Sequence, residues 1–426
     1  MRTVIKRVVI GTSLVALAWW SPVRTAGQVS RGVTFSKDVA PILFAKCAAC
    51  HRPGEVAPFS LLSFKDARPW AQSIKQQVVQ GAMPPWKADP RFGEFRDPRV
   101  LTGKEIATVV AWVDGGAREG NPAELPAAPT FTEGWQIGTP DVVLMMKEPV
   151  AIPASGTVPY ASYPTDFMLD RDVWVQAIEI RPGNRRVVHH AVAQAELPGV
   201  ANGPGGSQNV HLYSPGLEAM VWRQGYGKFF PKGTRFSFQM HYNAIGRETT
   251  DQSKIGLKFA TVTPHTQVNT SIVLNNTLLV PPMVQKHEVI AAFQFPNDAR
   301  IHALRPHMHL RARLGTASLV QPNGSRTVLL HIPDWDDSWQ NYYVLARPAR
   351  VGKGSILEYL ASYDNSPANA LNPDPLQPVP WGQQVWDEMH SVYMTWTAVN
   401  DRNEDDDEPI QLPPARLFTA TATARP

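Results

Sequence analysis

The stretch Arg305-Pro306-His307-Met308-His309 shows the pattern that the second half of the chain is expected to follow. Successive side chains of a β-strand point to opposite faces, so His307 and His309 share one face and lie about 7 Å apart along the strand. That spacing lets two imidazoles reach one metal ion. Taken alone, the pair equally describes two ordinary surface or core histidines. A metal site therefore requires further ligands from elsewhere in the chain.

Length and composition favour several domains of loop-rich β structure. The chain of 426 residues corresponds to two to four domains at roughly 150 residues each. Proline supplies 39 residues, about 9% against an average of about 5%, which disfavours helical bundles. The formal net charge is only +4 and no run of lysine or arginine stands out, so nothing indicates nucleic-acid binding.

The N-terminus has the pattern of a secretory signal peptide. Arg2, Lys6 and Arg7 precede an apolar run over residues 8–20, and small residues follow at 25–27. The apolar run is short for a membrane span. We expect a signal peptide over residues 1–27 and a periplasmic or secreted protein with no membrane span in the mature chain. An uncleaved N-terminal anchor is the alternative.

Both cysteines of the chain belong to one motif, Cys47-Ala48-Ala49-Cys50-His51. This is the attachment signature of c-type haem, in which two thiols add to the haem vinyl groups and the adjacent histidine binds the iron. A thioredoxin-like redox pair would need a βαβ context, and the surrounding sequence has none. The motif predicts covalently bound haem c, with Cys47, Cys50 and His51 as its binding residues.

Helical signals surround the haem motif. A helix is expected from near Ser36, and a second is introduced by a capping box of Thr102 and Glu105 with an apolar stripe over residues 106–113. Between them lies a proline-rich loop with Met83. This arrangement resembles a small class I cytochrome c, in which a loop methionine is the distal iron ligand. The resemblance implies that role for Met83; a core methionine is the alternative.

Three further strand-like segments carry candidate ligands. His189 and His190 are adjacent, so both can reach one metal only at a β-bulge or a strand end. His241 lies on the polar row of the strand expected over residues 234–242. Met389 lies on the polar row of the strand that opens at Asp387. These residues form two candidate sets, which are His189, His190 and His241, and His307, His309 and Met389.

The composition of the two sets points to copper. A thioether suits Cu(I), and imidazole suits copper in both oxidation states. Blue-copper proteins and multicopper oxidases need a cysteine thiolate, and both cysteines are committed to haem. A zinc hydrolase built on the histidines alone stays open, although Met389 would then be an unhelpful ligand.

The order and spacing of the motifs resemble the copper type II, ascorbate-dependent monooxygenases, the family of peptidylglycine α-hydroxylating and dopamine β-monooxygenases. The resemblance covers about residues 140–397. It rests on Pro140-Asp141-Val142, His189-His190, Gln239-Met240-His241-Tyr242, His307-Met308-His309 and Asp387-Glu388-Met389.

The resemblance has implications for fold and site. It implies an electron-storing copper at the first set, a copper that meets O₂ and substrate at the second, and two β-sandwich domains across an open cleft. It also implies that Arg305 and Tyr393 contact an anionic substrate. Ser391 replaces the asparagine of the peptide-hydroxylating members, so a glycine-extended peptide is not supported. A solvated rim position is the alternative for Arg305.

The predicted fold class is a small all-α class I cytochrome c followed by two all-β antiparallel, jelly-roll-like sandwich domains. The expected bounds are 1–27 for the signal peptide, 30–121 for the cytochrome c domain, 122–130 for a linker, and 131–272 and 273–420 for the sandwiches.

The predicted function is that of an exported haem- and copper-dependent monooxygenase. It would hydroxylate a C–H bond of a small-molecule or peptide-like substrate with O₂. Electrons from ascorbate or a periplasmic redox protein would pass through haem to the first of two copper ions. A non-catalytic copper-binding or electron-transfer protein with the same folds is the alternative.

Overall fold

The computed structural model describes residues 32–199, 207–217, 219–403 and 406–412. The predicted signal peptide lies outside these described residues. Contacts group the chain from Val33 onward into one compact unit. Within the described ranges, no helix is both long enough and apolar enough to cross a membrane.

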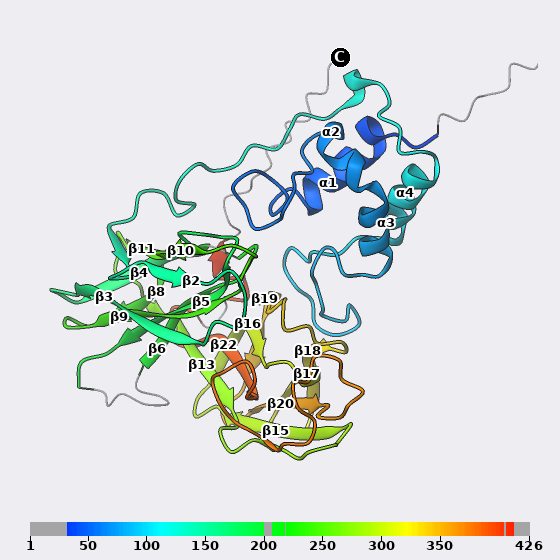
Figure 1. The fold of residues 1–426 in the computed structure, drawn as a ribbon. Helices are drawn as coiled ribbons and strands as arrows, with labels where there is room; N and C mark the ends of the chain where they lie inside the picture. Colours follow the sequence, from blue (N-terminus) through cyan, green and yellow to red (C-terminus); the bar gives the residue numbers. More distant parts are fainter. Residues whose placement is uncertain (1–31, 200–206, 218, 404–405, 413–426) are drawn as a thin grey trace, which may run out of the picture. The chain divides into compact units, whose positions relative to one another are not determined.

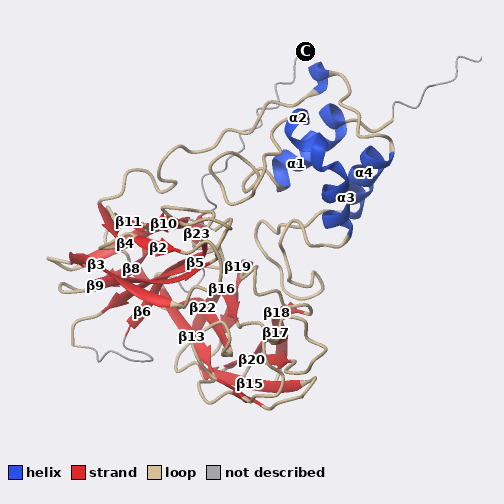
Figure 2. Cartoon of the chain, viewed as in Figure 1, coloured by secondary structure: helices blue, strands red, loops and turns tan. Residues whose placement is uncertain are grey.

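The helices precede the sheets in the chain (Figures 1 and 2). Their bounds are η1 Phe35–Val39, α1 Ala40–Lys46, α2 Phe64–Ala67, η2 Arg68–Trp70, α3 Ala71–Val79, α4 Gly103–Asp114 and η3 Pro122–Glu124. The expected capping box is confirmed, because Glu105 N donates to Thr102 Oγ1 and the Glu105 carboxylate accepts from Thr102 N. Val109 and Val113 of the predicted stripe are buried in a helical core with Trp112.

A first group of sheets encloses the first β core, which includes Val175, Trp222, Phe238 and Tyr242. A seven-stranded sheet contains β1 Val142–Met145, β4 Val173–Arg181, β7 Ala219–Trp222, β8 Tyr226–Phe230, β11 Lys254–Phe259, β12 Thr266–Gln267 and β23 Gln411–Leu412. A four-stranded sheet has the order β3 Ala161–Met168, β9 Arg235–Tyr242, β5 Val188–Glu196 and β6 Ser207–Tyr213. Strands β2 Val150–Ile152 and β10 Thr249–Asp251 form a separate pair.

A second group encloses the second β core, which includes Leu304, Met308, Tyr343 and Tyr359. One four-stranded sheet has the order β13 Asn269–Leu274, β22 Ser391–Ala398, β16 Ala299–His307 and β19 Tyr343–Val351. The other has the order β15 His287–Gln294, β20 Ile356–Tyr363, β17 Ala312–Val320 and β18 Arg326–Ile332. Strands β14 Leu279–Val280 and β21 Val379–Pro380 form a pair.

The predicted fold class is wrong. The part of the chain that the structure describes is mainly β, with 39% strand and 12% helix, and forms no small all-α cytochrome domain. The segment between α3 and α4 leaves the helical core and joins the second β core. Phe95 forms a β-bridge with Leu345, and Asp89 N donates to His331 O. The physical reason is aromatic burial: the Trp86 and Phe95 rings lie 4.9 and 5.4 Å from that of Tyr343.

The strand pairing also departs from two successive all-antiparallel domains. Strand β12 runs parallel to β8. Strand β23, near the end of the chain, returns to pair with β7. The predicted domain bounds themselves stay a prediction.

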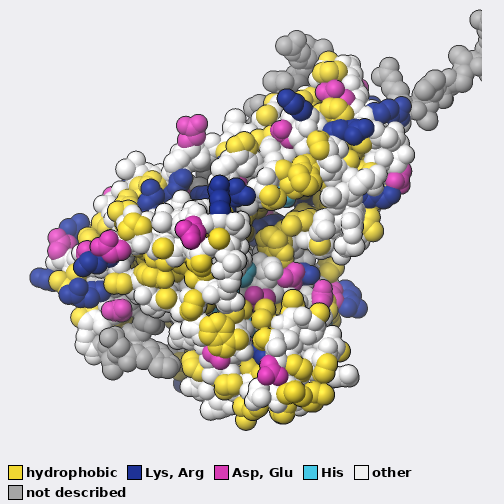
Figure 3. All heavy atoms as spheres, viewed as in Figure 1, with side chains coloured by type: hydrophobic (Ala, Val, Ile, Leu, Met, Phe, Trp, Pro, Cys, Tyr) yellow, Lys and Arg dark blue, Asp and Glu magenta, His cyan; other side chains and the backbone are white. Residues whose placement is uncertain are grey.

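Charged side chains of both signs are interspersed over the visible face of the molecule (Figure 3). This distribution agrees with the small net charge.

Candidate metal centres

The first set of predicted ligands comes together where β5 and β9 pair. His190 is directly opposite His241, and the register shifts between Val188 and His190. This irregularity is the bulge that joint use of two adjacent histidines requires. As a result, His189 Nδ1 lies 3.1 Å from both His190 Nδ1 and His241 Nδ1. The structure thus brings the three predicted ligands together.

The 3.1 Å spacing from His189 Nδ1 to each of the other two nitrogens matches a metal site. An imidazole nitrogen binds a divalent metal such as zinc at about 2.0–2.1 Å, which places two ligands about 3.1–3.4 Å apart at bond angles from about 100° to tetrahedral. Three ring nitrogens at such distances cannot all satisfy one another by hydrogen bonds, because each neutral imidazole has one donor and one acceptor nitrogen. A cation at the centre satisfies all three acceptors at once.

The surroundings keep these rings neutral and fix their orientation. Burial lowers the pKa of His189 and His190, and lowers that of His241 to about 3. The other nitrogen of His190, Nε2, contacts the Tyr160 hydroxyl, and the His189 ring donates to the Ser338 backbone. The three Nδ1 atoms are therefore left to face one another.

The second set lies at the end of β16. His307 is the last residue of the strand, and the His309 ring centroid lies 5.3 Å from that of His307. His307 Nδ1 faces Gln340 Oε1 at 2.5 Å, and His309 Nδ1 faces Asp387 O at 3.3 Å. Because Nδ1 of His307 is committed to an oxygen acceptor, its Nε2 is available as a ligand. The His309 ring also hydrogen-bonds the backbone of Gln384.

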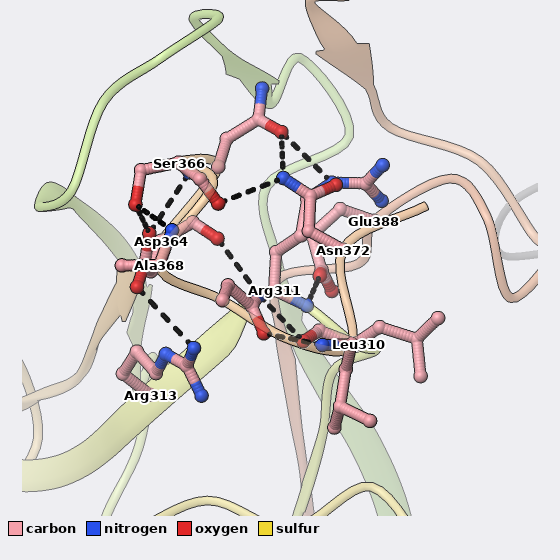
Figure 4. Close-up of polar contacts among 11 residues, drawn as sticks. Leu310, Arg311, Arg313, Asp364, Ser366, Ala368, Asn372 and Glu388 are labelled. Carbon is pink, nitrogen blue, oxygen red and sulfur yellow. Dashed lines mark hydrogen bonds and ion pairs between the residues drawn. The ribbon is translucent and has the colours of Figure 1, made fainter. Parts of the chain in front are cut away.

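Met389 is joined to this pair by a buried carboxylate. Glu388 Oε1 accepts from the backbone N–H groups of His309 and Met389, and Oε2 accepts from that of Arg311. Burial raises the pKa of Glu388 to about 8. Arg311 in turn donates to Asn365, within the polar turn that Figure 4 shows around Asp364, Ser366 and Asn372.

His390 does not compete with Met389 as a ligand. Its Nδ1 lies 2.9 Å from the Tyr363 hydroxyl, and its Nε2 lies 3.0 Å from Tyr359 O. Both nitrogens are therefore used within the second β core.

The two sets are adjacent to each other. The ring centroids of His190 and His307 lie 5.7 Å apart, so the two histidine groups form one continuous cluster. The resemblance had implied an open cleft between the two sets. No such cleft separates the rings of His190 and His307.

A cavity of about 310 Å³ opens beside the cluster, lined by His307, Met389, Arg305, Tyr393 and Tyr160 among others. Arg305 is 3% exposed, its guanidinium lies over the Tyr393 ring, and burial lowers its pKa to about 10. Its Nη2 donates to Gln340, and its buried Nε has no hydrogen-bond partner. Arg305 is therefore not a solvated rim residue.

The haem motif follows α1. Cys50 N and His51 N both donate to Cys47 O, which closes a tight turn. His51 Nδ1 lies 3.2 Å from Phe59 O, so its Nε2 is free, and burial lowers the pKa of its ring. These features fit an iron-ligating histidine. Met83 lies in the turn after α3, before a cis peptide bond to Pro84, and its role as the distal ligand stays a prediction.

Sequence reasoning missed two residues of the site, Tyr160 and Gln340. Neither belongs to a motif with metal-ligand spacing, and each reaches its histidine from a remote segment of the chain. The polar environment of a loop is too weak a signal to have identified them.

Comparison with known proteins gives no functional relationship. No family model and no curated protein matches the chain. Among solved structures, the major capsid protein P2 of bacteriophage PM2 is 10% identical with a TM-score of 0.27, covering 62% of this chain and 98% of that one. PNGF-II is 10% identical with a TM-score of 0.24, covering 60% and 64%. Likenesses this weak carry no argument about fold or function.

Proposed function

We propose that this protein is a copper-dependent monooxygenase that hydroxylates a C–H bond of an organic substrate. The observation that carries the proposal is the convergence of three histidines, in which His189 Nδ1 lies 3.1 Å from Nδ1 of both His190 and His241, beside a second histidine pair. His307 of this pair shares a cavity with Met389. Imidazole and thioether together favour an ion that cycles between Cu(I) and Cu(II).

Copper at the second set would supply the O₂-activating chemistry, and copper at the first set would store the second electron. One oxygen atom enters the C–H bond and the other leaves as water, with two electrons and two protons taken up. The residues of the chain hold the ligands. Gln340 and the Asp387 carbonyl orient His307 and His309, and Tyr160 orients His190.

The substrate class follows from Arg305. A buried cation is costly unless an anion pairs with it, and the contacts described for Arg305 are to the Gln340 amide and the Tyr393 ring. A carboxylate of the substrate would complete this pairing. Apolar side chains, including Ile272, Leu274 and Trp381, line the same cavity and suit a hydrophobic body.

The electron supply in this proposal is covalent haem at Cys47 and Cys50, with His51 as an iron ligand. Ascorbate or a periplasmic redox protein would reduce it one electron at a time.

The test is substrate-dependent O₂ consumption by the full chain, produced in a periplasm and loaded with copper. We expect two copper ions per chain and O₂ uptake that His307→Ala and His309→Ala abolish. His287→Ala, at a half-buried histidine in β15, is the matched control and should retain both the two copper ions and the O₂ uptake.

Two outcomes favour the alternatives. Copper binding with no substrate-dependent O₂ uptake, over a broad panel of carboxylates, would favour a non-catalytic electron-transfer protein. Protein that purifies with zinc and has no redox activity would favour a metallohydrolase. Activity that survives loss of His307 and His309 would contradict the proposed site.

A further inference from the structure

The loop between β18 and β19 reaches both histidine groups. Trp335 Nε1 donates to His309 O at 3.2 Å, and Gln340 Oε1 lies 2.5 Å from His307 Nδ1. The backbone of Ser338 accepts from the His189 ring. One loop thus contacts three of the candidate ligands: His189 in β5, His307 at the end of β16, and His309 two residues beyond that end.

The orientation of the Gln340 amide is determined by its neighbours. Its Nε2 donates to Asp337 O at 3.3 Å and to Asp337 Oδ1 at 3.1 Å. Its Oε1 faces Arg305 Nη2 at 3.2 Å, and arginine can only donate. If the amide were flipped, its NH₂ group would face the donor Arg305 Nη2, and its oxygen would face the two acceptor oxygens of Asp337. Oε1 therefore faces His307.

This orientation decides the tautomer of His307. Since Oε1 can only accept, Nδ1 of His307 must carry the proton, and the lone pair of the neutral ring is then on Nε2. Outer hydrogen bonds of this kind fix ring orientation and typically change metal affinity by about 10- to 100-fold when they are removed.

The loop is itself anchored at its outer side. Lys87 Nζ lies 3.2 Å from Asp334 Oδ2 and 3.7 Å from Asp336 Oδ2. Asn341, 5% exposed, donates from Nδ2 to Pro85 O at 3.0 Å. These contacts come from the segment that follows Met83, so the part of the chain next to the helices supports the loop.

We propose that the loop Asp334–Tyr342 is a brace shared by the two histidine groups, in which Gln340 is a positioning residue that selects the Nδ1-protonated tautomer of His307. The brace holds His307 and His189 to a single element and thereby keeps the two groups adjacent. Its relevance to copper rests on the proposed function, but the tautomer is a property of the protein without metal.

The first experiment measures the tautomer in the metal-free full chain. Histidine labelled with ¹⁵N reports the protonated nitrogen by NMR, and the His307 signals are assigned by their loss in His307→Ala. We expect the Nδ1–H form in the wild type and a loss of that preference in Gln340→Leu. Gln321→Leu removes a glutamine hydrogen-bonded to Ser355 in the distant β17–β18 turn, and it should leave the His307 signals unchanged.

A double variant separates positioning from simple stability. Asp337→Asn combined with Gln340→Glu exchanges the amide and the carboxylate, so that residue 337 now donates to residue 340, the reverse of the wild-type direction, and residue 340 still presents an oxygen to His307. We expect this variant to restore the Nδ1–H form. A Gln340→Leu chain that keeps the wild-type tautomer, or a double variant that behaves like Gln340→Leu, would overturn the proposal.

The second experiment titrates Cu(I) into the same proteins against a chromophoric chelator. Gln340→Leu should weaken the site at His307 by about 10- to 100-fold, and the double variant should recover most of the loss. If the wild type binds no copper at this set, the proposed function fails, while the tautomer result still decides the role of Gln340. If copper binds and Gln340→Leu changes neither readout, only the brace is refuted.

Discussion

The buried carboxylate of Glu388 accepts a hydrogen bond from the backbone N–H of His309 at 2.5 Å. The same oxygen accepts from the backbone N–H of Met389, so one side chain connects two candidate ligands. The same carboxylate accepts from Arg311 N at 3.0 Å, in the arrangement shown in Figure 4. Three backbone donors from two separate segments thus converge on one side chain.

This arrangement predicts that Glu388→Gln destabilises the fold. An amide offers an oxygen on one side only, so at least one of the three buried N–H groups loses its acceptor and faces an NH₂ group. Leaving a buried donor unsatisfied costs about 1–3 kcal/mol. Urea unfolding measures the loss.

The matched control for this prediction is Glu358→Gln. Glu358, in β20, lies 2.6 Å from the half-exposed guanidinium of Arg326, in β18. Surface pairs contribute about 0–1 kcal/mol, so this variant should stay close to the wild type. Equal free energies of unfolding for the two variants would contradict the role assigned to Glu388.

Which parts of the site could be predicted depended on how far apart in sequence the interacting residues lie. The Thr102 capping box and the bulge at His189 were found because both are local: a cap acts over three residues, and two adjacent ligands need a bulge. Gln340 lies 33 residues from His307, and no spacing rule joins them. Only the packing of β16 beside the β18–β19 loop brings them together.

The fold was mispredicted for a related reason. The helical signals before Asp114 are real but short, and they say nothing about where an intervening loop packs. Trp86 and Phe95 carry large apolar surfaces that the helical core does not bury, and they pack on Tyr343 instead. The energy of such aromatic burial is set by a partner about 250 residues away in sequence, which a local pattern does not contain.

Lys228 predicts a pH dependence of stability. Its ammonium group is buried, Nζ lies 2.8 Å from Thr270 Oγ1, and burial lowers its pKa to about 7. In the unfolded chain a lysine titrates near about 10.4. Between these two values the unfolded chain binds more protons than the folded one, so the free energy of unfolding should rise with pH across this window, by up to about 1.4 kcal/mol per unit.

The measurement is urea unfolding of the wild type and Lys228→Met at several pH values from 6 to 10. The variant should be the more stable protein at pH 6, where the wild type carries a buried charge. The difference should shrink steadily as the pH rises through 7 towards 10. Parallel stability curves would show that Lys228 is not the group responsible.

The haem motif predicts covalent attachment that depends on both thiols. Acid-acetone extraction should leave the haem on the wild-type protein. The same extraction should remove it from the double variant Cys47→Ser, Cys50→Ser. His51→Ala removes the ring whose Nδ1 faces Phe59 O, and it should convert the haem spectrum to a high-spin form without releasing the haem. Wild-type protein that carries no haem after production with a c-type maturation system would contradict the assignment.

Arg305 predicts selective binding of anions in the cavity. Its guanidinium is buried against Tyr393, with the Gln340 amide as a neutral partner. A carboxylate ligand should therefore pair with it, while a neutral analogue of the same shape should not. Phenylacetate should raise the Tm of the metal-free chain, and phenylacetamide should not; at 100 times Kd, binding to the folded state stabilises by about 2.7 kcal/mol.

Arg305→Met makes the comparison decisive. Methionine keeps most of the apolar volume and removes the charge, so the variant should fold while losing the response to phenylacetate. Arg326→Met, on the exposed side of the Glu358 pair, removes an arginine of the same protein without touching the cavity and should respond as the wild type does. If Arg305→Met retains the shift in Tm, the anion binds elsewhere and Arg305 does not recognise the substrate.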